Sequence, residues 1–230
     1  MFAFIPFGLP AYLLGFLGLK KPMSWVIYKC GEMWGKGIIS IIGCPLEVAG
    51  RENIPAQGEG GVCFVSNHAG IFDVALMLAY IGRPFGFIAK KELLFVPFFN
   101  MWIHILGGLF IDRKSIRKAL KTINSGIEKI RNGGNMLVFP EGTRSKGRGL
   151  LPFKSGAIKL ATNSLATIVP IAIAGSYEVF EKNNRVIAAP VRVTFCPPII
   201  TADMSPDDRR HKLADQVRTV IEAALAKPLA

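Results

Sequence analysis

The chain has 230 residues, and its 28 Lys plus Arg against 16 Asp plus Glu give a formal net charge of +12. Half of the residues are hydrophobic and only 19% are charged. This composition excludes disorder for most of the chain, and it excludes the polar, charge-rich type of nucleic-acid binder. The four cysteines form no C-x-x-C pair, so we expect small buried side chains in a reducing compartment, with neither disulfides nor a metal site.

The N-terminal segment differs from the rest of the chain. Residues 1–19 carry no charge and reach the length of a membrane span, but two prolines interrupt the first half. Residues 23–45 are amphipathic and contain Trp25 and Trp34, whose rings favour the level of lipid headgroups. These features predict a two-helix membrane anchor over residues 1–46. A single span and a helical hairpin buried against the domain are the alternatives.

From residue 47 onward, apolar runs of strand length alternate with helical stretches. The predicted strands are residues 62–66, 85–89, 108–111, 136–139, 167–172 and 191–195. The predicted helices are residues 72–81, 97–106, 115–132, 155–161 and 206–226, and residues 183–184 are expected to form a hairpin turn. This alternation predicts an α/β domain over residues 47–230, with a mixed, largely parallel sheet flanked by helices.

The positive charge is concentrated in one third of the chain. Residues 83–159 contain 15 Lys plus Arg against four Asp plus Glu, a net charge of +11. Part of this excess is expected to be the solvated face of the helix at residues 115–132. The rest predicts a field that attracts anionic lipid or a phosphorylated substrate.

His68 is the histidine placed for chemistry, because it follows the predicted strand 62–66 and a strand end is where α/β domains position reactive groups. Asp73 lies five residues further on. Along one helix this spacing rotates the two side chains about 140° apart, so they can meet only if His68 is in the loop and Asp73 in the first helical turn. A carboxylate on one ring nitrogen would leave the other nitrogen as a general base. The H-x4-D spacing alone is common by chance.

A second candidate element is the sequence FPEGTRS at residues 139–145, which follows the predicted strand 136–139. Gly142 would let backbone amides approach an anion, and the guanidinium of Arg144 suits a phosphate. Glu141 is expected to brace Arg144 or to accept from a hydroxyl. The alternative is a glycine turn with surface charges. Two further elements are the strand that ends in Arg113 and the sequence VPI at residues 169–171.

Taken in order, these elements resemble the glycerolipid acyltransferase superfamily, and most closely its 1-acylglycerol-3-phosphate acyltransferases. The resemblance covers residues 55–198, and its motifs are residues 67–73, 90–113, 139–145 and 169–171. Two positions depart from the usual pattern: Gly70, where many relatives have Ser, and Asn100, where many have Gly.

The resemblance implies that His68, oriented by Asp73, removes the proton from the free hydroxyl of lysophosphatidic acid. The acyl donor would be acyl-CoA or acyl carrier protein, the product phosphatidic acid, and neither metal nor cofactor would be required. The residues implied to bind the glycerol phosphate are Lys90, Arg113, Glu141, Gly142, Thr143 and Arg144.

Three alternatives remain open at this point. The acceptor could be another lysolipid or glycerol 3-phosphate, the enzyme could be a thioesterase, or the chain could be a noncatalytic protein bound to anionic lipid. Acyl thioesters are made in the cytoplasm, so we expect the domain on the cytoplasmic face of the inner membrane, with the bilayer and the acyl thioester as partners.

Overall fold

The computed structural model describes residues 20–96 and 99–229. The strands are β1 (Leu46–Ala49), β2 (Val62–Ser66), β3 (Gly86–Lys90), β4 (Leu109–Ile111), β5 (Met136–Val138), β6 (Thr167–Ala174), β7 (Val191–Phe195) and β8 (Ile199–Ile200). The α-helices are α2 (Lys20–Ile42), α3 (Asp73–Tyr80), α4 (Phe99–Ile105), α5 (Ile116–Arg131), α6 (Ser155–Ser164), α7 (Pro206–His211) and α8 (Leu213–Leu225). Short 3-10 turns are η2 (Arg51–Asn53), η3 (Lys91–Phe95), η4 (Ser176–Val179) and η5 (Thr201–Asp203).

The strands form one sheet in the order β1-β7-β6-β2-β5-β3-β4, with β8 paired to β6. The neighbours from β6 to β4 are all parallel, whereas β7 and β8 are antiparallel to β6. The expected mixed, largely parallel sheet is therefore confirmed. Because the strands from β6 to β4 run the same way, their carboxyl ends share one edge of the sheet, and polar residues that follow them meet there.

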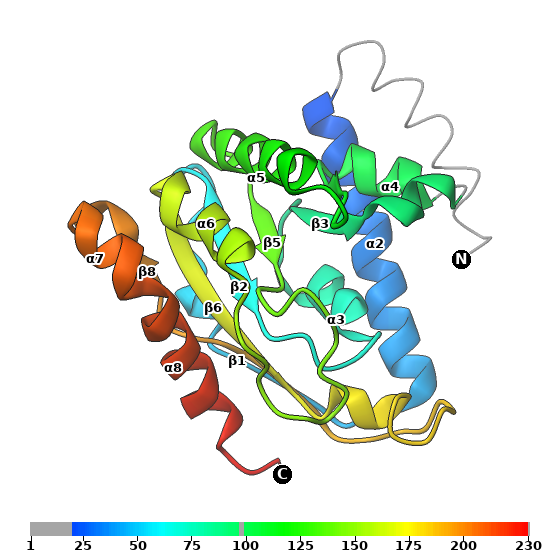
Figure 1. Ribbon diagram of the computed structural model, residues 1–230. Helices are drawn as coiled ribbons and strands as arrows, with labels where there is room; N and C mark the ends of the chain where they lie inside the picture. The colour runs from blue at the N-terminus through cyan, green and yellow to red at the C-terminus, as the bar shows by residue number, and fades with distance from the viewer. Residues whose placement is uncertain (1–19, 97–98, 230) are drawn as a thin grey trace.

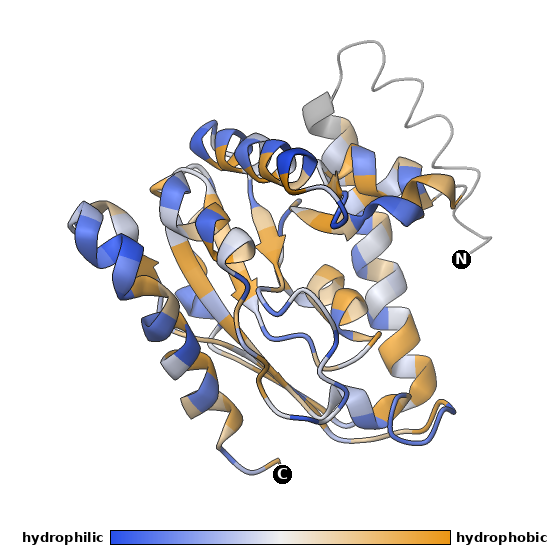
Figure 2. Ribbon diagram, viewed as in Figure 1, coloured by the Kyte–Doolittle hydropathy of each residue, from blue (hydrophilic) through white to orange (hydrophobic). Residues whose placement is uncertain are grey.

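Helices cover both faces of the sheet (Figure 1). Alternate residues of β2 point to opposite sides: Phe64 joins an apolar cluster with α2 and α3, and Val65 joins a second cluster with α5, α6 and α8. Figure 2 shows the hydrophilic residues of α5 and α8 on their outer sides. All five residues of β2 are buried, as expected for a central strand covered on both faces.

Helix α2 is packed on the domain through a buried face. Ile27 and Tyr28 are fully buried in the core, and the Tyr28 hydroxyl accepts a hydrogen bond from the Gly82 N–H at 2.8 Å. A Cβ at Gly35 would lie 2.4 Å from the Ala75 carbonyl oxygen, so α2 and α3 approach closely. In the described ranges, 20–96 and 99–229, no helix combines the length and hydropathy of a bilayer span. Residues 1–19, the first part of the expected anchor, lie outside the described residues, and the anchor stays a prediction.

The predicted final helix is divided into two. Ser205 caps α7 by accepting from the Asp208 N–H at 3.0 Å, as the sequence predicts, but Lys212 separates α7 from α8. Residues 183–184 lie in a turn, but this turn is part of the long connection from β6 to β7 and not of a tight hairpin. Pro170 lies in β6 between the residues that pair with β8 and those that pair with β7. Its missing N–H therefore costs neither pairing a hydrogen bond.

Candidate active site

The carboxyl edge of the sheet gathers most of the residues that the sequence singles out. His68 follows β2, Glu141 follows β5, and Lys90 is the last residue of β3. Arg113 follows β4, which pairs with β3 so that Lys90 is opposite Ile111. The parallel order of these strands therefore brings segments far apart in the sequence to one edge.

His68 and Asp73 form a hydrogen-bonded pair. The His68 Nδ1 lies 2.7 Å from Asp73 Oδ2, with His68 in the loop after β2 and Asp73 as the first residue of α3. The expected loop-to-helix arrangement is confirmed. Asp73 is fully buried, and its Oδ2 also accepts the Gly70 N–H at 2.9 Å. Because Asp73 presents an acceptor, Nδ1 carries the proton and the Nε2 lone pair remains available as a base.

The second oxygen of Asp73 has a partner that the sequence reasoning missed. The Ser176 hydroxyl donates to Asp73 Oδ1 at 2.5 Å, and Ser176 is fully buried at the start of η4. The two residues are 103 positions apart, so no local spacing connects them. The contact arises because Ser176 follows β6, which is paired directly with β2, and no signal in the sequence shows this pairing.

The segment after β5 holds the His68 loop. The rings of Phe139 and His68 stack with centroids 4.1 Å apart and an interplanar angle of 18°. The Ser145 N–H donates to the His68 carbonyl at 2.7 Å, and the Lys146 N–H donates to the Ala69 carbonyl at 3.1 Å. These contacts fix both the ring face and the backbone of the loop.

Glu141 has a different place from the one expected. It is 1% exposed, and its two carboxylate oxygens accept the N–H groups of His68 at 2.6 Å and Leu151 at 3.0 Å. Burial raises the pKa of Glu141 above its usual value, against the two backbone hydrogen bonds and the nearby His68. The expectation that Glu141 braces Arg144 is wrong: this carboxylate holds the loop that carries His68.

Arg144 is held instead by Glu181, in the connection after η4. The Arg144 Nη1 lies 2.8 Å from Glu181 Oε1, and the same oxygen accepts the Ile71 N–H at 2.7 Å. The Glu181 side chain is 3% exposed and that of Arg144 is 36% exposed. Glu181, also missed from the sequence, therefore joins the guanidinium to the His68–Asp73 loop.

The remaining predicted site residues are at the surface of the same edge. Lys90, Arg113 and Thr143 are exposed, and Gly142 adopts a left-handed φ of 65°. A hydrogen bond from Lys91 Nζ to Asp112 Oδ2 at 2.8 Å links the segments that follow β3 and β4, and it raises the pKa of Lys91. Within the described ranges, no group of three or more His, Cys, Asp or Glu residues could hold a metal ion.

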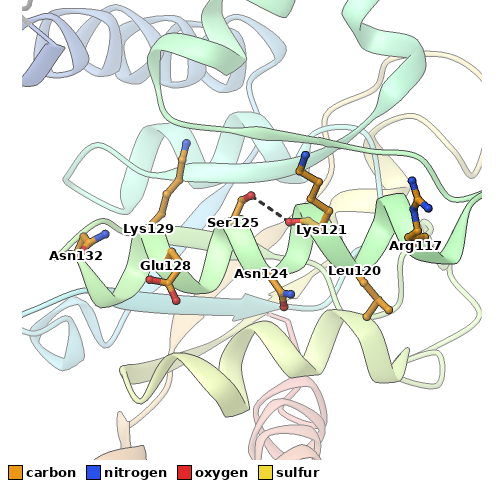
Figure 3. A pocket seen from close by; sticks show the side chains of 8 residues that line it. All are labelled: Arg117, Leu120, Lys121, Asn124, Ser125, Glu128, Lys129 and Asn132. Carbon is orange, nitrogen blue, oxygen red and sulfur yellow. Dashed lines mark hydrogen bonds between the residues drawn. The ribbon is translucent and has the colours of Figure 1, made fainter.

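A hollow elsewhere on the surface is formed by one helix. Figure 3 shows side chains of α5 around it, and Ser125 donates to the Lys121 carbonyl at 3.0 Å. The lining residues are Arg117, Leu120, Lys121, Asn124, Ser125, Glu128, Lys129 and Asn132. None of them is a predicted site residue, so we place the chemistry at the strand ends.

Comparisons with known proteins identify the family. A family model described as "Acyltransferase" matches residues 45–174. The chain is 31% identical over 198 residues to the 1-acyl-sn-glycerol-3-phosphate acyltransferase of Salmonella typhimurium, and 32% identical to that of Escherichia coli K12. Each of these matches covers 86% of this chain and 79% of the relative.

A solved structure is also similar. It is the crystal structure of the 1-acyl-sn-glycerophosphate (LPA) acyltransferase PlsC from Thermotoga maritima, with a TM-score of 0.81 and 26% sequence identity. The match covers 97% of this chain and 90% of that chain.

Proposed function

This chain belongs to the acyltransferase family, and we propose that it transfers a fatty acyl group from an acyl thioester to the free hydroxyl of 1-acylglycerol-3-phosphate. The product would be phosphatidic acid, a precursor of phospholipids. The observation that carries the proposal is the 2.7 Å contact between His68 Nδ1 and Asp73 Oδ2. This contact leaves His68 Nε2 available as a base at the end of β2. The names of the relatives describe the same acyl transfer.

In the proposed first step, His68 Nε2 takes the proton of the acceptor hydroxyl. Asp73 keeps the proton on Nδ1 and stabilises the imidazolium that forms. The hydroxyl oxygen bonds to the thioester carbonyl carbon, and a tetrahedral oxyanion results. When this intermediate collapses, the carbon–sulfur bond breaks and the leaving thiolate takes the proton from His68. The reaction uses neither a metal ion nor a cofactor.

The oxyanion needs hydrogen-bond donors, and several backbone N–H groups near His68 already have other acceptors. The backbone N–H groups of His68, Gly70 and Ile71 are used by Glu141, Asp73 and Glu181 respectively. The N–H groups of residues 145 and 146 donate to carbonyl groups of the His68 loop. The oxyanion donors are therefore to be sought outside these five amides.

The phosphate of the acceptor is proposed to bind the cationic groups at the same edge. Lys90 and Arg113 are exposed at the ends of paired strands, and Arg144 presents a partly exposed guanidinium. Gly142 and Thr143 lie in the turn between Glu141 and Arg144 and are proposed to approach the phosphate through backbone or hydroxyl donors.

The membrane association of the enzyme belongs to the same proposal. The uncharged residues 1–19 and the basic residues 83–159 favour a bilayer with anionic lipid, on the cytoplasmic face where acyl-CoA or acyl carrier protein is available. A monotopic or peripheral enzyme of the inner membrane would reach both the lipid acceptor and the thioester donor.

The test is an assay of labelled acyl-CoA and acyl carrier protein against lysophosphatidic acid, other lysolipids and glycerol 3-phosphate. We expect phosphatidic acid from the wild type and its loss in His68→Ala. His211→Ala is the matched control, because His211 is exposed on α7, and it should keep full activity. Full activity in His68→Ala would refute the mechanism, and release of free fatty acid without lipid product would identify a thioesterase.

A further inference from the structure

The segment that follows β6 contributes a hydroxyl to the buried side of the catalytic pair. Ser176 Oγ, Asp73 and His68 form a hydrogen-bonded row: the hydroxyl donates to Oδ1 at 2.5 Å, and Oδ2 faces His68 Nδ1 at 2.7 Å. Each carboxylate oxygen therefore has a separate partner. The hydroxyl is not the helix cap of η4, whose N-cap position is Gly175 without a side-chain hydrogen bond.

The turn that carries Ser176 is packed between the chain before β7 and the His68 loop. Gly175 ends the segment with a left-handed φ of 81°, and a Cβ there would lie 2.1 Å from the Pro190 carbonyl oxygen. This close approach fixes the turn that delivers Ser176 to Asp73. A Cβ at Gly70 would lie 3.0 Å from the Ser176 carbonyl oxygen, so the His68 loop passes directly against this turn.

Burial makes the Ser176 hydroxyl difficult to replace. Ser176 and Asp73 are both fully buried, so water has no access to Oδ1 in place of the hydroxyl. A hydrogen bond to a buried carboxylate is among the stronger polar contacts in a protein, and it also limits rotation of the carboxylate. By donating to Oδ1, the hydroxyl holds the carboxylate plane in the orientation that turns Oδ2 toward His68 Nδ1.

We propose that Ser176 is a positioning residue for acyl transfer, which holds Asp73 through Oδ1 so that Oδ2 stays aligned with His68 Nδ1. This inference rests on the proposed function, because it assigns a role within the same His68–Asp73 site. Ser176 acts through Asp73 and does not contact the substrate.

The first test compares Ser176→Ala with the wild type in steady-state assays. We expect kcat to fall about 10- to 100-fold with KM within about threefold, because alignment is lost while the phosphate-binding groups remain. Ser164→Ala is the matched control: Ser164 is 2% exposed and donates to the Ala161 carbonyl at 3.1 Å, at the end of α6. This control should keep kcat within about twofold.

The second test separates positioning from a loss of folding stability. In an Asp73→Asn background the hydroxyl has no carboxylate to orient, so adding Ser176→Ala should change kcat by less than about twofold. Multiplied losses in the double variant, or a Ser176→Ala enzyme as active as the Ser164→Ala control, would overturn the proposal. If Ser176→Ala fails to fold, Ser176→Cys fills the site with a weak donor and should lose activity to an intermediate extent.

The third test needs no substrate and therefore distinguishes this inference from the proposed function. The His68 Nδ1–H proton, followed by NMR, should exchange faster with solvent in Ser176→Ala than in the wild type, since Oδ2 is no longer held opposite Nδ1. Glu141, the carboxylate that accepts the His68 N–H, is unchanged in the variant. Faster exchange of this proton in a chain without acyltransferase activity would keep the inference and refute the proposed function. An unchanged exchange rate would refute the inference.

Discussion

Replacement of Glu141 by glutamine should reveal how the loop that carries His68 is held. In the wild type, the two carboxylate oxygens accept N–H groups from His68 and Leu151 at 2.6 and 3.0 Å. Glutamine has one acceptor oxygen and one NH2 group, so either orientation leaves one backbone N–H facing a donor. At a side chain that is 1% exposed, this mismatch should lower the free energy of unfolding by about 1–3 kcal/mol.

The effect should depend on pH. Burial raises the pKa of Glu141, so the folded protein holds this proton to a higher pH than the unfolded chain does. The stability from the protonated carboxyl is complete below the usual glutamate pKa of 4.5 and is lost as the pH rises through the raised value. Glutamine does not titrate, so the stability difference between wild type and Glu141→Gln should be larger at pH 4 than at pH 8.

The assay is urea unfolding of both proteins at the two pH values, with Glu128→Gln as the matched control. Glu128 is on the outer side of α5 with its side chain 64% exposed, and its replacement should change stability by less than about 0.5 kcal/mol. Equal stability of Glu141→Gln and wild type at both pH values would contradict the assignment of Glu141 to the loop. Acyl transfer by Glu141→Gln should fall as well, because the His68 backbone loses its acceptor.

Three other changes test separate parts of the structure. Gly70→Ala should raise the acceptor KM several-fold, because its Cβ would lie 2.7 Å from Glu181 Oε2 and displace the carboxylate that holds the Arg144 guanidinium. The control is Gly37→Ala, whose Cβ would have no atom within 4 Å, and it should leave KM unchanged. Equal kinetics of the two variants would contradict the reasoning. Burial raises the pKa of Cys63 to about 12 and that of Cys196 to about 11, so both thiols should resist a thiol reagent at pH 8 until urea is added. Reaction of all four thiols in the folded protein would contradict this prediction. Removal of residues 1–19, which spares the packed helix α2, should release the protein from anionic vesicles in a sedimentation assay, whereas full retention would assign binding to the domain surface.

The sequence predicts for a geometric reason how His68 and Asp73 can meet, whereas their catalytic role is implied by the family resemblance. The five-residue spacing from His68 to Asp73 cannot place both on one helix, so only a loop-to-helix arrangement lets them meet. The structure shows this arrangement. The gathering of Lys90, Arg113 and the FPEGTRS segment at one edge follows in the same way from strand–helix alternation, because parallel strands align their carboxyl ends.

The supporting residues could not be predicted because their partners are distant in the sequence. Glu181 and Ile71 are 110 positions apart, and nothing in the intervening chain shows that β6 lies beside β2. Proximity in sequence was misleading for Glu141 and Arg144, which are three residues apart but have different environments. Glu141 faces two backbone amides in the interior, whereas Arg144 reaches Glu181 near the surface.

The site combines two parts with different physical requirements. Partly buried His68 is joined by short hydrogen bonds to the buried carboxylates of Asp73 and Glu141, and the proposed proton transfer would require such fixed distances. Lys90 and Arg113, the proposed phosphate-binding residues, are exposed on long side chains, which would suit a phosphate that enters and leaves with each turnover. Changes in the interior part should therefore reduce kcat and stability together, whereas changes in the exposed cations should raise KM and leave stability unaltered. A Lys90→Ala or Arg113→Ala variant that lost kcat without a change in KM would show that these cations act on the transition state rather than on binding of the acceptor.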